Sequence, residues 1–264
     1  MQSFLAYMGG KSLLASQIIP RIPVHNCYVE VFAGAAWMLF KKDENMSRVE
    51  IINDINLDLI TLYRVVKHHL EEFIRYFKWV LVSRDEYYRF RKEEPETLTD
   101  IQRAVRFYYL LKLGYAARIK NPSFSIATTS RPRLNLLRIE EELSAVHLRL
   151  SRVYIENRSY AEVLSRFDKP DTFFYIDPPY YGCEDYYGDG IFNRGDFAKL
   201  RDILASLSGK YILSINDVPE IRELFKDLYI HKVATSYSAG GANKKKKVTE
   251  LLIMNYEPKG SMIN

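Results

Sequence analysis

Short apolar runs rich in β-branched and aromatic residues recur along the chain, each bounded by polar or turn-forming positions. Runs of this length and composition predict β-strands. They are Cys27–Phe32, Val49–Asn53, Val153–Glu156, Thr172–Ile176, Tyr211–Ile215, Leu228–Val233 and Thr249–Asn255. Helical spacing of apolar residues follows several of these runs, in Asn56–His69, Phe197–Leu207 and Val218–Phe225. Alternating strands and helices predict a mostly parallel α/β sheet with helices on both faces.

A long helical stretch interrupts this alternation. Between residues 57 and 150 the apolar positions follow helical spacing, ending in Leu136, Ile139, Leu143, Val146 and Leu150. The segment Arg118–Pro132 within it has the proline, serine and threonine content of a loop. We therefore predict a sheet domain formed by residues 1–56 and 151–264, with residues 57–150 as a helical insertion.

The distribution of charge distinguishes this insertion. The whole chain has a net charge of +5, but no carboxylate occurs between Asp100 and Glu140. Eight basic residues occupy that window, and the remaining chain has 30 basic against 33 acidic residues. The eight are Arg103, Arg106, Lys112, Arg118, Lys120, Arg131, Arg133 and Arg138. The window predicts either a polyanion-binding segment or a solvated basic face, and charge alone does not decide between them.

Composition excludes several classes of protein. A chain with 47% hydrophobic and 27% charged residues is expected to fold rather than remain disordered. Its two cysteines, Cys27 and Cys183, are far apart and lack metal-ligand spacing. Because no signal peptide is recognisable either, we expect a cytoplasmic protein without a structural metal. No apolar run has the length of a membrane span, so we expect no membrane partner.

The segment Asp177-Pro178-Pro179-Tyr180 directly follows the predicted strand Thr172–Ile176. Ligand sites in open parallel sheets lie beyond the carboxyl ends of strands. Two prolines fix the backbone and remove two N–H donors, so the loop presents carbonyl oxygens and one carboxylate. The Asp177 carboxylate and the Pro178 carbonyl can accept the two N–H bonds of an exocyclic amine, while Tyr180 can stack on a base. The alternative is a turn that merely ends a strand.

A second motif is the run from Glu30 to Ala36, in which a predicted strand leads into a turn of small residues. Small residues allow a nucleoside to approach the backbone closely, although they also serve tight helix–strand packing. Asp54 follows Gly34 by 20 positions, the spacing of an acid that binds ribose hydroxyls. The pair predicts a nucleoside cofactor.

Glycine and lysine occur together in two further segments. Gly9-Gly10-Lys11-Ser12 lacks the glycine that a phosphate-binding P-loop needs five positions before Gly10, where this chain has Leu5. It predicts either a turn that presents Lys11 to a carboxylate-bearing ligand or a plain surface turn. In the second segment Gly240-Gly241 predicts a hairpin tip, and Lys244–Lys247 follows as a phosphate-binding or merely solubilising tract.

Taken in order, these motifs resemble the Dam-like branch, or D12 class, of the adenine-N6-specific DNA methyltransferases. The resemblance covers nearly the whole sheet domain. It rests on the aromatic-x-Gly-Gly-Lys start at Tyr7, the Glu-x-Phe-x-Gly turn at Glu30, Asp-Ile-Asn at Asp54, Ser159-Tyr160, the Asp-Pro-Pro-Tyr loop, and Lys246–Leu252. Tyr7 stands where close relatives often have tryptophan, and Ala36 where the family usually has glycine.

The resemblance implies a Rossmann-like, S-adenosylmethionine-dependent methyltransferase fold with a helical target-recognition insertion. It implies methylation of adenine N6 in duplex DNA, by base flipping and direct transfer of the methyl group. The catalytic residues it implies are Asp177, Pro178 and Tyr180. The cofactor-binding residues it implies are Tyr7, Lys11, Glu30, Phe32, Gly34, Asp54, Ser159, Tyr160 and Asp177.

The DNA contacts are predicted from charge and position together. Candidates are Arg118, Lys120, Asn121, Arg131, Arg133, Lys244, Lys245 and Lys246. The recognition stretches of GATC-specific members are not recognisable in Leu113–Thr129, so GATC is only one of the possible targets. We expect a monomer, bacterial or phage-encoded, with or without a partner restriction enzyme. An RNA methyltransferase, an N4-cytosine methyltransferase and a non-catalytic DNA-binding protein are the alternatives.

Overall fold

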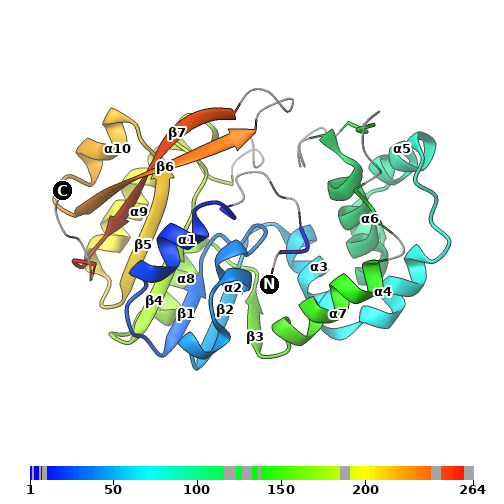
Figure 1. Cartoon of the computed structure of the whole chain (residues 1–264), viewed down its shortest axis with the longest axis horizontal. Helices are drawn as coiled ribbons and strands as arrows, with labels where there is room; N and C mark the ends of the chain where they lie inside the picture. The colour runs from blue at the N-terminus through cyan, green and yellow to red at the C-terminus, as the bar shows by residue number, and fades with distance from the viewer. Residues whose placement is uncertain are drawn as a thin grey trace.

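A seven-stranded sheet with the order β3-β2-β1-β4-β5-β7-β6 forms the centre of the protein (Figure 1). The computed structural model describes residues 1, 3–5, 7, 11–115, 123–126, 133–135, 138–184, 191–238 and 245–258. The strands are β1 (Cys27–Glu30), β2 (Val49–Asn53), β3 (Val153–Glu156), β4 (Thr172–Ile176), β5 (Lys210–Asn216), β6 (Tyr229–Ser238) and β7 (Lys245–Met254). The first five in chain order are parallel, whereas β7 runs antiparallel to both β5 and β6. This confirms the predicted Rossmann-like α/β sheet.

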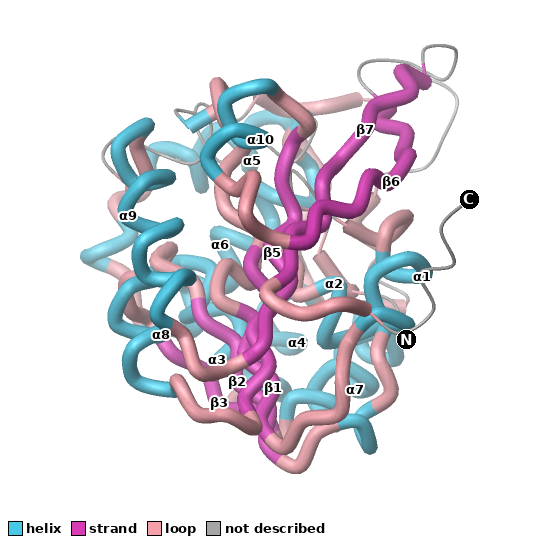
Figure 2. Tube along the Cα trace, turned by 90° about the vertical axis from the view of Figure 1, so that its left-hand side faces the viewer, coloured by secondary structure: helices cyan, strands magenta, loops and turns pink. Residues whose placement is uncertain are grey.

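Alternating side chains of the strands enter two apolar layers. In β4, Phe173 and Tyr175 pack with α1 (Ala15–Ile18), α2 (Trp37–Lys41) and α3 (Leu57–His68). Phe174 and Ile176 pack with α8 (Tyr160–Phe167), α9 (Arg194–Ser206) and α10 (Pro219–Leu224). Figure 2 shows helices on both sides of the strands, with α8 and α9 on one side and α1 and α2 on the other. Because both faces are covered, β4 is buried along its whole length.

Helices occupy most of the chain between β2 and β3. Along all the described residues, the helices are α1 (Ala15–Ile18), η1 (Ile19–Arg21), α2 (Trp37–Lys41), η2 (Glu44–Met46), α3 (Leu57–His68), α4 (Leu70–Phe77), α5 (Arg84–Lys92), η3 (Pro95–Thr97), α6 (Asp100–Leu113), α7 (Ile139–Leu150), α8 (Tyr160–Phe167), α9 (Arg194–Ser206) and α10 (Pro219–Leu224). Those from α3 to α7 lie between β2 and β3. In Figure 1, α4, α5 and α6 lie together to the right of the sheet. Buried Tyr63, Phe73 and Tyr108 extend one apolar cluster from the sheet into these helices. The division at residues 57 and 150 therefore stays a prediction.

Several elements begin or end at other residues than predicted, and for two of them the local reason is clear. Helix α3 begins at Leu57, because the Asn56 side chain accepts a hydrogen bond from Leu59 N and caps the helix. Strand β1 ends at Glu30, two residues before the predicted end, where the chain enters the turn that contains Gly34. Ser238 of β6 lies opposite Lys245 of β7, and the predicted hairpin tip lies outside the described residues.

The order of the strands reverses between β1 and β4. From β1 the chain proceeds to β2 on one side, whereas β4 and β5 extend the sheet on the other. The loops that leave the carboxyl ends of β1 and β4 therefore diverge, which leaves a crevice between them. Val31 N donates to Tyr175 O over 3.0 Å and fixes the start of this crevice. Among the described residues, no helix is long and apolar enough to cross a bilayer.

Candidate active site and cofactor pocket

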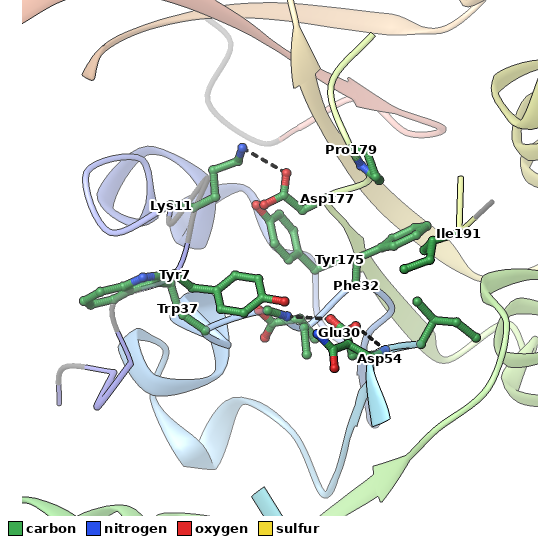
Figure 3. A pocket seen from close by; sticks show the side chains of 15 residues that line it. Tyr7, Lys11, Glu30, Phe32, Trp37, Asp54, Tyr175, Asp177, Pro179 and Ile191 are labelled. Carbon is green, nitrogen blue, oxygen red and sulfur yellow. Dashed lines mark hydrogen bonds and ion pairs between the residues drawn. The ribbon is translucent and has the colours of Figure 1, made fainter. Parts of the chain in front are cut away.

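A pocket lies at this crevice, and the space in it that no atom fills is about 680 Å³, part of which is open to solvent. It is built from the segments that follow β1, β2 and β4, together with the chain before α1 (Figure 3). The residues that line it are Tyr7, Lys11, Glu30, Phe32, Ala33, Gly34, Ala35, Trp37, Asp54, Ile55, Asn56, Tyr175, Asp177, Pro179 and Ile191. The structure thus brings most of the predicted cofactor-binding residues to one place.

Gly34 is held in a conformation that favours glycine. Its φ is +49°, and a Cβ at this position would lie 3.1 Å from Cδ1 and 3.2 Å from Cε1 of Tyr7. Its N–H donates to Asp54 Oδ2 over 2.9 Å, and its carbonyl accepts a hydrogen bond from the Tyr63 hydroxyl over 2.8 Å. The turn is therefore fixed from both sides, with the Tyr7 ring directly against it. Ala36, two residues later, also has φ +49°, which is the conformation that the family's usual glycine adopts most easily.

Asp54 connects the turn after β1 to the turn after β2. Its Oδ2 holds Gly34 N, and its Oδ1 accepts a hydrogen bond from Asn56 N over 2.9 Å. Burial raises the pKa of this carboxyl, while its hydrogen bonds with backbone N–H groups act in the opposite direction. The side chain is half-buried at the pocket wall, where the sequence placed a ribose-binding acid.

Glu30 ends β1 with only 2% of its surface exposed. Its Oε2 accepts hydrogen bonds from the Tyr28 hydroxyl and from Leu39 N, each over 3.0 Å. Burial raises its pKa to about 8, and the nearby Asp177 adds to the rise. At neutral pH much of this carboxyl is therefore protonated in the free protein.

Asp177 leaves the end of β4 and points towards the same pocket. Its Oδ1 lies 2.9 Å from Lys11 Nζ, and its side chain is 18% exposed. Figure 3 marks this ion pair with a dashed line. Burial raises the pKa of Asp177 to about 7; Lys11 opposes the rise and the charge of Glu250 adds to it. Pro178 and Pro179 are buried, so the carboxylate projects from a rigid support.

The loop that contains Asp177 is also held at its far side. Asn216, the last residue of β5, accepts a hydrogen bond from Tyr181 N over 2.9 Å and donates one to Tyr181 O over 3.0 Å. Lys11 Nζ lies 4.3 Å from the Tyr180 ring centroid and donates to the Tyr180 hydroxyl, which donates in turn to Glu250 Oε1. In this structure the Tyr180 ring is therefore engaged by Lys11 on one face.

Four of the predicted site residues lie beside the pocket rather than in its lining. Pro178 and Tyr180 belong to the loop itself. The Ser159 hydroxyl forms a capping box with Glu162 at the start of α8. The Tyr160 ring stacks on Phe32 with ring centroids 5.7 Å apart, so it supports a residue of the pocket wall. Their predicted roles stay predictions.

Most of the predicted DNA contacts lie outside the described part of the chain. Arg133 is described and exposed. Lys245 and Lys246 begin β7, but the structure does not describe their side chains. The candidates outside the described residues are Arg118, Lys120, Asn121, Arg131 and Lys244.

Sequence reasoning missed three polar residues around the loop: Ser214, Asn216 and Glu250. Glu250 is fully buried in β7, and a lone carboxylate within an apolar run was the signal available for it. Asn216 ends an apolar run in the same way. In the described residues no group of three or more His, Cys, Asp or Glu side chains has an arrangement that suits a metal ion.

Comparisons with known proteins agree with this geometry. The sequence profile of the D12 class N6 adenine-specific DNA methyltransferases matches residues 7–239. The DNA adenine methylase of Escherichia coli K12 is 30% identical over 286 residues, covering 97% of this chain and 96% of that protein. The type II methyltransferases M1.LlaDCHI of Lactococcus lactis and M.CviBI of a Paramecium bursaria Chlorella virus are 27% and 26% identical, covering 96% and 100% of their own lengths. This chain therefore belongs to the D12 class of N6 adenine-specific DNA methyltransferases.

Proposed function

We propose that this DNA adenine methyltransferase binds S-adenosylmethionine in the pocket around Gly34 and uses Asp177 to hold the target adenine. The observation that carries the proposal is the meeting of the two predicted motifs in one pocket. Gly34, Asp54 and Asp177 come from the ends of three different strands, yet all three line it.

The lining suits a nucleoside that carries a positive charge. Tyr7, Phe32 and Trp37 offer aromatic surface, and the tight turn at Gly34 allows close approach to the backbone. Three carboxyl groups, Glu30, Asp54 and Asp177, face the pocket against one ammonium group, that of Lys11. A bound cation favours the ionised forms of these carboxyl groups, so a cationic ligand gains more from this wall than a neutral one. When bound, S-adenosylmethionine supplies a methyl group that is activated by its sulfonium.

Asp177 and Pro178 are positioned to hold an exocyclic amine. The carboxylate accepts one N–H of adenine N6, and the Pro178 carbonyl accepts the other, which directs the nitrogen lone pair towards the methyl group. Catalysis then derives from orientation and polarisation, with no covalent intermediate on the protein. An adenine within duplex DNA reaches this pocket only after it leaves the base stack, so the proposal includes base flipping. Stacking of the base on Tyr180 requires that the Lys11 side chain yield one face of the ring.

The helices between β2 and β3 are proposed to recognise the DNA target. Their basic window contains Arg103 and Arg106, which are tied to Asp58 and to the carbonyl of Phe90, and also the exposed Arg133. Exposed cations without such ties suit phosphate contacts. Replacing Lys244–Lys247, the lysines at and just before the start of β7, by alanine should reduce the slope of DNA affinity against salt concentration, because fewer counterions are released. The slope of the unchanged protein is the reference, and an identical slope would contradict phosphate contacts there.

The decisive experiment uses Asp177→Asn with labelled cofactor and mixed DNA. The amide keeps the size of the side chain but loses the negative charge that polarises the amine. We expect cofactor binding to persist while methyl transfer falls by at least about 100-fold. Sequencing of the DNA methylated by the unchanged protein would identify the modified adenines and their target site, and a parallel incubation with structured RNA tests the alternative substrate. A variant as active as the parent would refute the catalytic role of Asp177.

A further inference from the structure

Glu250 places a carboxylate in the interior of the sheet. It lies in β7 between Asn216 of β5 and Val233 of β6, and none of its surface is exposed. Its neighbours along the strand, Leu251 and Leu252, are fully buried as well. A carboxylate in such surroundings is costly unless charged and hydrogen-bonding groups surround it.

The partners of Glu250 are groups of the active-site loop and the pocket. Oε2 lies 3.4 Å from Lys11 Nζ and accepts a hydrogen bond from the Ser214 hydroxyl over 3.1 Å. Oε1 accepts a hydrogen bond from the Tyr180 hydroxyl over 2.5 Å. Lys11 Nζ is at the same time 2.9 Å from Asp177 Oδ1. One ammonium group is thus shared between two carboxylates, only one of which faces the substrate.

This sharing determines how strongly Asp177 holds a proton. The charged and titratable groups that act on it are Lys11 from the segment before α1, Glu250 from β7, and Glu30 and Tyr175 from β1 and β4. Tyr180 of its own loop is linked to it through Lys11. Lys11 alone would keep Asp177 ionised and weakly basic. Glu250 draws the ammonium towards itself and repels the charge of Asp177, so it opposes that effect. The pKa of Asp177 rises through burial first, and the charge of Glu250 raises it further.

We propose that Glu250 is a positioning residue for methyl transfer: it holds Lys11 and Tyr180 in place and leaves Asp177 able to take the proton that the amine loses. This inference rests on the proposed function. In the step concerned, a bond forms between N6 and the methyl carbon as the carbon–sulfur bond breaks, and the electron pair of the broken bond stays on sulfur. The nitrogen then gives one proton to the Asp177 carboxylate, which leaves a neutral methylated amine and a carboxylic acid.

The test is the pKa of Asp177 in the cofactor-free protein, with and without Glu250. Carbon-13 NMR of the aspartate carboxyl groups measures it, and the signal that disappears in Asp177→Asn identifies the residue. In Glu250→Gln we expect the pKa of Asp177 to fall by about 1, because a like charge nearby is removed. Glu223→Gln, on the exposed side of α10, removes the same charge elsewhere and should leave that pKa unchanged. An unmoved Asp177 in folded Glu250→Gln would overturn the inference.

A second pair of variants covers the possibility that Glu250→Gln does not fold. Lys11→Gln should raise the pKa of Asp177, and Lys11→Gln combined with Glu250→Gln should bring it back towards the original value. The double variant buries no unpaired charge from this pair, so its fold is under less strain than that of either single variant. Equal pKa values in Lys11→Gln and in the double variant would show that Glu250 does not act on Asp177.

Activity gives an independent measurement. The limb of the pH profile of kcat on which activity rises with pH should move to lower pH in Glu250→Gln, by about the same amount as the pKa. The maximal kcat should fall about tenfold, because a weaker base takes the proton. A uniform loss of kcat at all pH values would indicate a merely structural role and overturn the inference. Failure of the unchanged protein to bind S-adenosylmethionine would instead overturn the proposed function, so the two failures are distinguishable.

Discussion

Replacement of Gly34 by alanine tests whether the tight turn after β1 forms the cofactor site. The new methyl group meets two obstacles. The backbone has φ +49°, and the Cβ would lie 3.1 and 3.2 Å from two carbons of the Tyr7 ring. Gly182 provides a matched control, because its φ is +84° but nothing lies within 4 Å of its added Cβ. The two variants share the backbone penalty, and only Gly34→Ala displaces a pocket residue.

The magnitudes separate the two effects. A left-handed backbone costs an alanine about 1–2 kcal/mol, and the reduced entropy of the unfolded chain returns about 0.4–1 kcal/mol. Each variant should therefore lose about 1 kcal/mol of unfolding free energy, or roughly 2–4 °C in Tm for a chain of this size. In Gly34→Ala the ring of Tyr7 must also shift by a few tenths of an ångström. We expect this shift to weaken cofactor binding by about tenfold, equivalent to roughly 1.4 kcal/mol.

Scanning calorimetry and titration calorimetry with S-adenosylmethionine measure the two quantities on the same samples. Similar Tm losses in both variants, with weaker cofactor binding only in Gly34→Ala, are the expected result. If both variants bound the cofactor as tightly as the parent, the Gly34 turn would not form the cofactor site. If both bound it equally weakly, the contact with Tyr7 would not be the cause.

Four further predictions concern the loop, the pocket, the stability of the free protein and the base of the sheet. Asn216→Ala removes both hydrogen bonds to the Tyr181 backbone and should lower kcat about tenfold with little change in cofactor affinity. Asn255 provides the control, because it makes an equivalent pair of hydrogen bonds, with Tyr211 N and Gly209 O, at the opposite end of β5. Asn255→Ala should lose similar stability and keep its kcat. Equal losses of kcat in the two variants would contradict a positioning role for Asn216. Glu30 and Asp177 have pKa values raised to about 8 and about 7, so a bound cation should displace protons from them and cofactor affinity should rise from pH 6 to pH 8. Calorimetry in buffers of different ionisation heat measures the protons released on cofactor binding, and a pH-independent affinity would refute this prediction. For the same reason the folded protein binds more protons than the unfolded chain above the ordinary glutamate pKa of 4.5. The unfolding free energy of the free protein should therefore fall as pH rises from there to about 8. Glu50→Gln leaves the buried Lys42 and Arg149 without their shared carboxylate. It should lower the unfolding free energy, measured by urea unfolding, by about 3–5 kcal/mol. A loss below about 1 kcal/mol would show that the two cations find other partners.

The sheet and the position of Asp177 were predictable because they depend on local pattern. A central parallel strand is buried on both faces, so Thr172–Ile176 appears as an uninterrupted apolar run, and the residue after it must lie at the ligand-binding edge. The Gly34 turn and Asp54 were predictable for the same reason. Each follows directly from its own strand, and the two strands are neighbours.

The environment of Asp177 was not predictable, because it depends on strand order. Lys11 and Glu250 come from opposite ends of the chain and meet only because β7 inserts beside β5. The left-handed backbone of Ala36 was not predicted either, although the glycine that the family usually has at this position was a sign of it. Many of the abundant tyrosines are core residues, and Tyr63, Tyr108 and Tyr109 are almost completely buried.

The insertion of β7 between β5 and β6 has a consequence for biosynthesis. A ribosome makes β6 before β7, yet β6 has no partner in the sheet until β7 arrives between it and β5. Until then the edge of β5 remains open, and Lys11 and Tyr180 lack the carboxylate that orders them. A nascent or truncated chain that ends before Lys245 would therefore hold most of the sheet but lack the carboxylate that we propose to position Lys11 and Tyr180, so we expect it to transfer methyl groups poorly.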